Sequence, residues 1–295
     1  MSNVATIRDF SRENLNIHPQ SQLRTHYDEK NKIGWFLMRG SPTPCFTLKL
    51  LSEINTYLDG VKLDMQKTNG KKYKYLVVGS DVEGVFNLGG DLELFSRYID
   101  DRDRESLLSY ALKCIDILYR NIYHYNLDLT TISLIQGDAL GGGFEAALSS
   151  NIIIAECGVK IGFPEVLFNL FPGMGAYSLL SRKIGFTAAE KMILSGEIFS
   201  SEQLHDMGVI DILANKGEGE VAVYRYIKAV KRAENTYNSM RKIKDICNPV
   251  NYQELTEIAT LWADAALKLS PRDIRMMHRL IRRQNTRVTS SQKIW

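Results

Sequence analysis

The chain has 295 residues, of which 44% are hydrophobic and 24% charged, and its formal net charge at pH 7 is +3. This composition is ordinary for a globular protein, and the length suits one large domain or one domain with a small appendage. No run of 18 apolar residues and no apolar N-terminal core is present. We therefore expect no membrane insertion, no signal peptide and a cytoplasmic location. The four scattered cysteines favour reduced thiols over a disulfide framework or a zinc site.

In chain order, the sequence predicts a polar arm followed by alternating strands and helices. Residues 1–30 are polar and predict the irregular arm. Short apolar runs predict strands at 33–39, 73–79, 130–136, 152–155, 159–163 and 210–213. Apolar residues at helical spacing predict helices at 47–58, within 92–126, at 144–150, and from 219 onward with breaks near 248–249 and 270–271. This alternation indicates an α/β class.

Two further helices are predicted by their capping signals. Residues 187–190 (TAAE) and 200–203 (SSEQ) have the spacing of capping boxes. Gly196 and Gly208 follow at positions where a glycine can end each helix.

Familiar catalytic signatures do not occur in the sequence. It contains no GxSxG elbow, no HExxH, no P-loop and no GxGxxG. The five histidines lie in polar or helical surroundings, which favours surface or structural roles, so a histidine-based triad is not expected.

Two glycine-rich segments follow predicted strands. Residues 86–91 read FNLGGD, and residues 136–147 run from a strand through three glycines into a helix. Glycine lets the backbone approach a ligand closely, and the first N–H groups of a helix are unpaired at its positive end. Together the two turns could present two N–H groups to one developing negative oxygen, as an oxyanion hole. The alternative is that both are tight turns whose glycines serve packing only.

Two glutamates stand alone in apolar stretches. Glu145 lies between Phe144 and two alanines, and Glu165 lies between Pro164 and Val166. A buried carboxylate without a partner is unfavourable, so such groups tend to be functional or to have a raised pKa. The alternative is a pair of surface glutamates, but their occurrence in consecutive elements beside glycine turns favours general acid and base roles.

These segments resemble the signature of the crotonase (enoyl-CoA hydratase/isomerase) superfamily. Residues 135–147 and 162–176 carry the resemblance, and residues 87–91 lie where that family has its first oxyanion turn. The resemblance implies an α/β crotonase ββα spiral over residues 31–215 and a C-terminal helical region over 216–295. It also implies a homotrimer or a hexamer.

The resemblance further assigns roles to individual residues. Gly90 and Gly142 would supply the two oxyanion N–H groups, and Glu145 and Glu165 would transfer protons. We favour Glu165 as the base and Glu145 as the acid. No metal or redox cofactor is needed for this chemistry.

Other features depart from an ordinary hydratase and are similar to the synthases of diffusible signal factor. The first turn reads NLGGD at 87–91 where an ordinary hydratase is alanine-rich, and the stretches 35–38, 42–46 and 164–177 are also particular. The resemblance implies dehydration of a 3-hydroxyacyl chain on acyl carrier protein to the cis-2-enoyl form. It also implies hydrolysis to a free fatty acid signal.

The acyl tail of such a substrate requires an apolar pocket. Leu140 and Met174 flank the catalytic turns, and Trp262 and Leu280 lie on C-terminal helices that could close the pocket. Core packing is the alternative role for all four. Two other functions stay open: an ordinary enoyl-CoA hydratase or isomerase acting on acyl-CoA, and a non-catalytic crotonase-like subunit that binds a partner.

The end of the chain is basic. Residues 271–295 contain one acid, Asp273, and seven basic residues: Arg272, Arg275, Arg279, Arg282, Arg283, Arg287 and Lys293. This charge predicts an anionic partner such as acyl carrier protein, with a solvated helix face as the alternative. Nucleic acid is not expected, because no recognisable binding module accompanies the charge.

Overall fold

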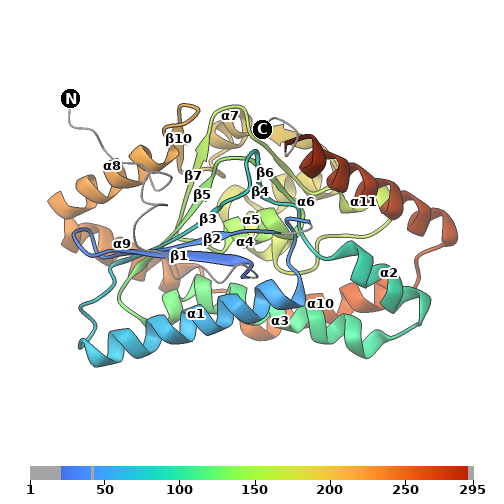
Figure 1. The fold of residues 1–295 in the computed structure, drawn as a ribbon, viewed down its shortest axis with the longest axis horizontal. Helices are drawn as coiled ribbons and strands as arrows, with labels where there is room; N and C mark the ends of the chain where they lie inside the picture. The colour runs from blue at the N-terminus through green and yellow to red at the C-terminus, as the bar shows by residue number, and fades with distance from the viewer. Residues whose placement is uncertain (1–20, 41–42, 292–295) are drawn as a thin grey trace.

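The computed structural model describes residues 21–40 and 43–291, with side chains through Arg282. The strands of its larger sheet are β1 (Leu23–Asp28), β2 (Ile33–Met38), β3 (Tyr75–Ser80), β5 (Thr130–Ile135), β7 (Ile152–Glu156) and β10 (Ile212–Ala214). The strands of its smaller sheet are β4 (Val85–Asn87), β6 (Asp138–Leu140), β8 (Lys160–Gly162) and β9 (Ile198–Ser200). The larger sheet has the order β1-β2-β3-β5-β7-β10 (Figure 1). The smaller sheet has the order β4-β6-β8-β9.

Helices surround the two sheets. They are α1 (Leu48–Lys67), α2 (Leu92–Asp100), α3 (Arg104–Ile122), α4 (Gly142–Leu148), α5 (Ala176–Ile184), α6 (Phe186–Ser195), α7 (Ser201–Asp206), α8 (Gly219–Arg232), α9 (Glu234–Cys247), α10 (Tyr252–Ala266) and α11 (Pro271–Ser291). The described residues also form the 3-10 turns η2 (His124–Asn126) and η3 (Pro164–Phe168). None of the helices, over the part of the chain that is described, is long and apolar enough to cross a membrane.

The larger sheet is buried on both faces. Trp35 of β2 belongs to a buried cluster with Val223 and Ile227 of α8, whereas Phe36 faces the main core together with Leu50 of α1. Every residue of β2 is therefore buried, and the strand shows no polar alternation. This is the pattern expected of a mostly parallel sheet covered by helices on two sides.

The chain builds both sheets in successive ββα units. β3 is followed by β4 and then by α2 and α3, β5 by β6 and α4, and β7 by β8, η3 and α5. β4, β6 and β8 are parallel neighbours in the smaller sheet. Their carboxyl ends meet at one sheet edge, which is where ligands bind in many α/β proteins.

Several expectations from the sequence need correction. The irregular arm predicted for residues 1–30 is wrong over Leu23–Asp28, which form β1 antiparallel to β2, while residues 1–20 lie outside the described part. β1 is an edge strand with only its first residues buried, so it carries polar residues like an exposed segment. The helical stretch expected within 92–126 is broken, because Asp103 caps the start of α3.

The two capping boxes have different outcomes. The box at 200–203 is confirmed, since the Ser200 hydroxyl accepts from the Gln203 amide and the Gln203 side chain accepts from Ser200. The box at 187–190 is wrong, because α6 already begins at Phe186. Its N-cap is Gly185, with φ of 84° and no side-chain cap. The division into a core over 31–215 and a helical region over 216–295 stays a prediction.

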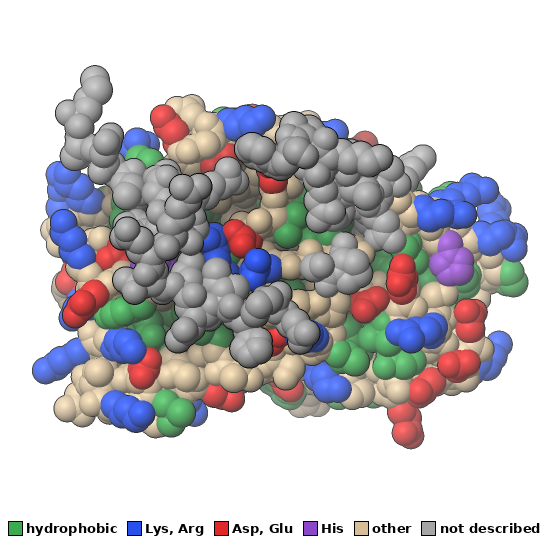
Figure 2. All heavy atoms as spheres, in the orientation of Figure 1, with side chains coloured by type: hydrophobic (Ala, Val, Ile, Leu, Met, Phe, Trp, Pro, Cys, Tyr) green, Lys and Arg blue, Asp and Glu red, His purple; other side chains and the backbone are tan. Residues whose placement is uncertain are grey.

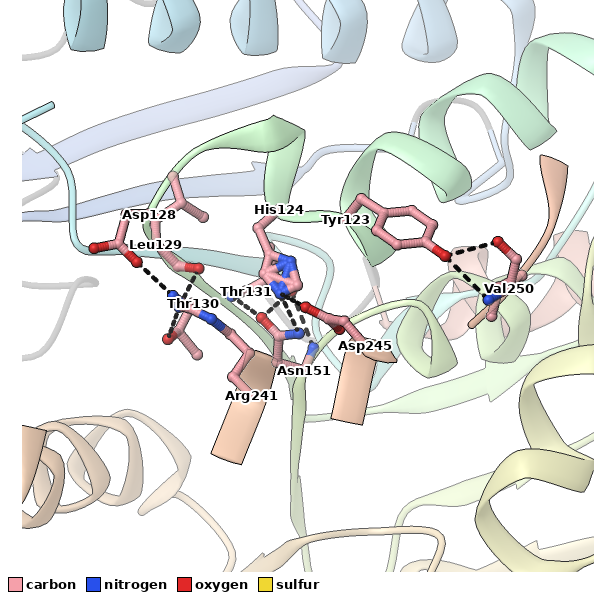
Figure 3. Close-up of polar contacts among 10 residues, drawn as sticks. All are labelled: Tyr123, His124, Asp128, Leu129, Thr130, Thr131, Asn151, Arg241, Asp245 and Val250. Carbon is pink, nitrogen blue, oxygen red and sulfur yellow. Dashed lines mark hydrogen bonds and ion pairs between the residues drawn. The ribbon is translucent and has the colours of Figure 1, made fainter. Parts of the chain in front are cut away.

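α9 is held to the body of the molecule by polar contacts (Figure 3). None of its residues is buried. Arg241 forms an ion pair with Asp128 at 2.6 Å, and buried His124 contacts Asn151 at 3.2 Å and Asp245 at 3.6 Å. Burial lowers the pKa of His124 to about 4, so this ring is neutral at pH 7 and its role is structural.

Candidate active site

The three neighbouring strands of the smaller sheet bring the two glycine turns and Glu165 together. Gly90 follows β4, Gly142 follows β6 and Glu165 follows β8. A Cβ on Gly142 would lie 3.4 Å from the Gly90 nitrogen, and a Cβ on Gly141 would lie 2.3 Å from Glu165 Oε1. Gly90 and Gly142 are about fifty residues apart in the chain, and Glu165 follows about twenty residues later. The fold thus brings all three into one site.

The amides of Gly90 and Gly142 are available to a ligand. Asn87, which is buried, accepts a hydrogen bond from the Gly89 N–H at 2.8 Å and so fixes the first turn. Within the described residues, the Gly90 and Gly142 N–H groups donate to no protein acceptor. Gly142 is the first residue of α4, where an N–H is unpaired by construction and lies at the positive end of the helix.

Glu145 is completely enclosed and fixed in place. Its Oε1 accepts hydrogen bonds from the Met174 N–H at 2.8 Å and the Ala176 N–H at 3.0 Å. Burial raises the pKa of Glu145 to about 7, although the two N–H donors favour its ionised form. The group can therefore exchange a proton near neutral pH.

Glu165 lies in the η3 turn with its carboxyl directed inward. Its Oε2 is buried and has no hydrogen-bond partner among the described residues. Burial, and then the nearby carboxyl of Glu145, raise the pKa of Glu165 to about 8. A carboxyl that lies against the Gly141 backbone through one oxygen and has its other oxygen buried and unpaired is what a proton-transferring group awaiting its substrate requires.

These pKa values predict a bell-shaped dependence of kcat/KM on pH. One carboxyl of the pair must be ionised and the other protonated, so the pair must hold a single proton. We expect activity to rise up to about pH 7, to be highest between about 7 and 8, and to fall above about 8. A pH series of initial rates checks this, and a profile that stays flat from pH 5 to 10 would contradict the paired roles.

Tyr110 of α3 supports the first oxyanion turn, a role that the sequence analysis missed. Its hydroxyl donates to the carbonyl of Phe46 and accepts from the Asp91 N–H at 3.3 Å. Phe46 in turn donates its N–H to the Gly89 carbonyl at 2.8 Å. The Gly89-Gly90 turn is thus tied to a neighbouring segment through one hydroxyl.

We expect Tyr110→Phe to lower kcat by about tenfold while changing KM little. The substitution keeps the ring but removes the hydrogen bond that the hydroxyl donates to the Phe46 carbonyl and the one that it accepts from the Asp91 N–H, a loss of roughly 1–3 kcal/mol. Steady-state kinetics and urea unfolding, measured together, check this prediction. A loss of stability with unchanged kcat in the folded protein would reduce Tyr110 to a structural role.

An apolar pocket opens beside the two glycine turns. It is lined by Phe46, Leu51, Gly90, Tyr110, Cys114, Ile117, Leu118, Gly142, Ala146 and Met174. Pockets with an apolar lining of this kind commonly bind small apolar ligands.

Only one of the four residues predicted for the acyl pocket lines this cavity. Met174 does, whereas Trp262 is fully buried and packs against Phe95, with ring centroids 5.0 Å apart. Leu280 of α11 packs on the main core, and Leu140 ends β6 beside the Gly89 turn. For these three, contact with an acyl chain stays a prediction.

The described part of the chain contains no group of three or more His, Cys, Asp or Glu side chains placed to hold a metal ion.

Two sheets built from successive ββα units, with glycine amides and two carboxyls at one sheet edge, define a crotonase fold. Residues 40–276 match the enoyl-CoA hydratase/isomerase family, and the chain belongs to that family of enzymes. The predicted α/β crotonase fold and the resemblance to this superfamily are confirmed.

Relatives and solved structures agree with this assignment. Mitochondrial methylglutaconyl-CoA hydratase of Mus musculus is 28% identical over 236 residues, which are 78% of this chain and 68% of that protein. The human mitochondrial delta3-delta2-enoyl-CoA isomerase superposes with a TM-score of 0.73 at 18% identity, over 90% of this chain and 99% of that one. Pseudomonas aeruginosa DspI does so with a TM-score of 0.64 at 22% identity, over 80% and 89%. These structural likenesses show the fold alone.

Proposed function

We propose that this enzyme dehydrates a 3-hydroxyacyl thioester on acyl carrier protein and then hydrolyses the thioester. The product would be a free cis-2-unsaturated fatty acid of the diffusible signal factor class. The observation that carries the proposal is the pair of enclosed carboxyls, Glu145 and Glu165, whose pKa values of about 7 and about 8 suit proton transfer beside two unpaired amides. The cis geometry and the signalling role rest on the sequence resemblance.

In the first step the thioester oxygen binds to the Gly90 and Gly142 N–H groups. Glu165 lies against Gly141, next to that oxygen, so it faces the α-carbon and takes its proton. Glu145 is held at Met174, which lines the apolar pocket, so it faces the β-carbon. It protonates the leaving hydroxyl, the C–O bond breaks, and the enolate electrons form the double bond. Before the reaction Glu165 must be ionised and Glu145 protonated. Because Glu165 has the higher pKa, this protonation state is disfavoured by about 1.4 kcal/mol, which is a small part of an enzymatic barrier.

The second step would return both carboxyls to their starting forms. After dehydration Glu145 is ionised and a water molecule has formed beside it. Glu145 takes a proton from water, and the oxygen attacks the carbonyl that Gly90 and Gly142 still polarise. When the tetrahedral intermediate collapses, Glu165 donates its proton to the leaving thiolate. Two carboxyls can thus serve both reactions without a separate nucleophile.

Product analysis with purified enzyme and 3-hydroxydodecanoyl carrier protein tests this function. We expect free cis-2-dodecenoic acid, identified by mass spectrometry and NMR. Accumulation of trans-2-enoyl thioester without free acid would leave an ordinary hydratase, the main alternative. No turnover of either carrier or CoA thioesters would favour a non-catalytic subunit.

Acyl carrier protein, which is acidic, is the partner that we propose for the basic face of α11. This helix packs against α2, which follows the first oxyanion turn, and against η3, which carries Glu165. Arg272, Arg275 and Arg279 are exposed on it, and Figure 2 shows Lys and Arg side chains gathered at the right of the molecule, where Figure 1 draws α11. Arg283, Arg287 and Lys293 lie outside the described side chains.

We expect the double reversal Arg275→Glu with Arg279→Glu to weaken carrier binding at least tenfold and to flatten its salt dependence. The matched control is Arg225→Glu with Lys228→Glu, which reverses two exposed charges on α8 at the other end of the molecule. Affinities measured at two salt concentrations check this. Equal losses in both variants would mean a general charge effect, and no loss in either would place docking elsewhere.

We also propose the homotrimeric or hexameric assembly that the resemblance implies. The side chains of Tyr237, Met240 and Ile243 are exposed along one face of α9 and are available for such contacts. Sedimentation equilibrium tests this, and a monomer at micromolar concentration would contradict it.

A further inference from the structure

We infer that Asn87 is a positioning residue that holds the two glycine turns at a fixed spacing. Asn87 is the last residue of β4, and only 1% of its surface is exposed. The inference rests on the proposed binding of a thioester oxygen to the Gly90 and Gly142 N–H groups. It names the side chain that keeps these two groups directed at the same point.

The first glycine turn leaves a single backbone N–H free. Among the described residues, each N–H from 88 to 91 has an acceptor except that of Gly90. The acceptors of the other three are the Pro44 carbonyl for Leu88 at 2.8 Å, Asn87 Oδ1 for Gly89 at 2.8 Å, and the Tyr110 hydroxyl for Asp91 at 3.3 Å. Asn87 therefore engages the N–H next to the free one and so fixes the direction of the peptide group between them.

The hydrogen bond from Gly89 to Asn87 holds a conformation on which the second turn depends. Gly89 has φ of 97°, in the left-handed region that glycine adopts readily. A Cβ at this position would lie 3.0 Å from the Gly142 nitrogen and 3.0 Å from the Leu140 carbonyl oxygen. The Gly89 backbone thus lies directly against the second turn, and a rotation of its peptide group would move the Gly90 N–H relative to that of Gly142.

The backbone of Asn87 also contacts the helix that begins at the second turn. A Cβ on Gly143 would lie 2.1 Å from the Asn87 carbonyl oxygen and 3.0 Å from the Asn87 Cβ. Gly143 directly follows Gly142 in α4. The close approach of α4 to β4 is therefore set at Asn87, whose side chain at the same time orients Gly89.

The nitrogen end of the Asn87 side chain is poorly paired, which argues against a role in packing alone. Nδ2 contacts the Met38 thioether at 3.5 Å and has no oxygen acceptor among the described residues. A thioether is a weak acceptor, and a buried amide donor without a good acceptor lowers stability. An apolar side chain would avoid this cost, so the useful part of the asparagine is the oxygen that binds Gly89.

Binding of two ligands that differ in one oxygen tests the inference without turnover. One is the ketone analogue of dodecanoyl-pantetheine, in which CH₂ replaces the thioester sulfur, so that the carbonyl cannot be hydrolysed. The other is the dodecyl thioether of pantetheine, which has no carbonyl. Calorimetry gives the ratio of the two affinities. For the wild-type protein we expect the ketone to bind at least about tenfold more tightly, because two N–H groups donate to its oxygen.

Asn87→Ala should reduce this preference to about threefold or less, because the Gly89 peptide group is no longer held. Asn87→Ser should give an intermediate value, since a serine hydroxyl can accept more weakly from the N–H two residues further on. The matched control is Asn151→Ala. Asn151 binds Thr131 at the start of β5 (Figure 3), whereas the second glycine turn follows the end of that strand. This control should lower the midpoint of urea unfolding and keep the wild-type preference for the ketone.

The role of Asn87 is overturned if the folded Asn87→Ala protein keeps the wild-type preference, or if Asn151→Ala reduces the preference equally. It is also overturned if Asn87→Ser is no better than Asn87→Ala. Should Asn87→Ala fail to fold, the comparison of Asn87→Ser with the wild type decides, and an unchanged preference in the serine variant would count against the inference.

Failure of the proposed function gives different results. A wild-type protein that binds both ligands equally would show that the glycine amides hold no carbonyl oxygen, and the proposed reaction would then fail together with the role of Asn87. A wild-type protein that prefers the ketone but releases no free acid from 3-hydroxydodecanoyl carrier protein would contradict the proposed reaction alone. In that case the ligand preferences of the Asn87 variants still decide the role of this residue.

Discussion

Glu165→Gln is expected to lower the dehydration rate by about 10²–10⁴, because an amide can neither take the α-proton nor return it. Glu145→Gln should have an effect of the same order. Glu190→Gln, which changes an exposed glutamate on α6, should retain full activity. Rates of product formation measured by mass spectrometry check the prediction. Wild-type rates in both single variants at the catalytic positions would show that proton transfer occurs through other groups.

Glu165→Gln should also be more stable than the wild type in alkaline solution. The pKa of Glu165 is raised from 4.5 to about 8 by burial and by Glu145. The folded protein therefore holds this proton more tightly than the unfolded chain does. The free energy of unfolding of the wild type accordingly falls as pH rises from about 4.5 to about 8.

Glutamine carries no charge, so Glu165→Gln should be more stable than the wild type by roughly 1–3 kcal/mol at pH 9. At pH 4 the difference should nearly vanish, because both side chains are then neutral. Urea unfolding at the two pH values measures this. An inactive protein that is less stable at both pH values would point to misfolding rather than to the loss of a catalytic group.

The candidate catalytic groups can be singled out in the sequence because their chemistry conflicts with their local sequence. A lone carboxyl among apolar residues, as at Glu145, has no purpose in ordinary packing, and three glycines at the start of a helix are unfavourable unless the backbone itself is used. Gly141, with φ of 51° and no room for a Cβ against Glu165, has the tight environment that its sequence suggests. Such conflicts are visible in a single sequence.

The apolar pocket beside the glycine turns was less accessible to sequence reasoning. Leu51, Cys114 and Leu118 occupy ordinary buried positions of amphipathic helices, and such a helix looks the same whether its apolar face meets a core or a cavity. The three-residue strands β4, β6 and β9 also gave no separate signal, because they are too short to show a period. The sequence shows that these residues are apolar, but it does not show how they are arranged in the tertiary structure.

Gly142→Pro is expected to lower kcat by about 10²–10³, which corresponds to the loss of one oxyanion-hole donor. Gly142 is the first residue of α4, a position where proline is well tolerated because its N–H is unpaired in any helix. The substitution therefore removes the donor with little change to the helix.

Gly142→Ala is the matched control, because it keeps the N–H. Its Cβ would meet the nearest atom, Gly89 Cα, at 3.4 Å, which is an ordinary contact. In Gly142→Pro, the steady-state rate of dehydration of a 3-hydroxyacyl thioester and the rate of hydrolysis of a preformed 2-enoyl thioester should both fall. Both reactions would use the same amide. If the alanine variant loses as much activity as the proline variant, crowding at the turn and not the missing donor is the cause.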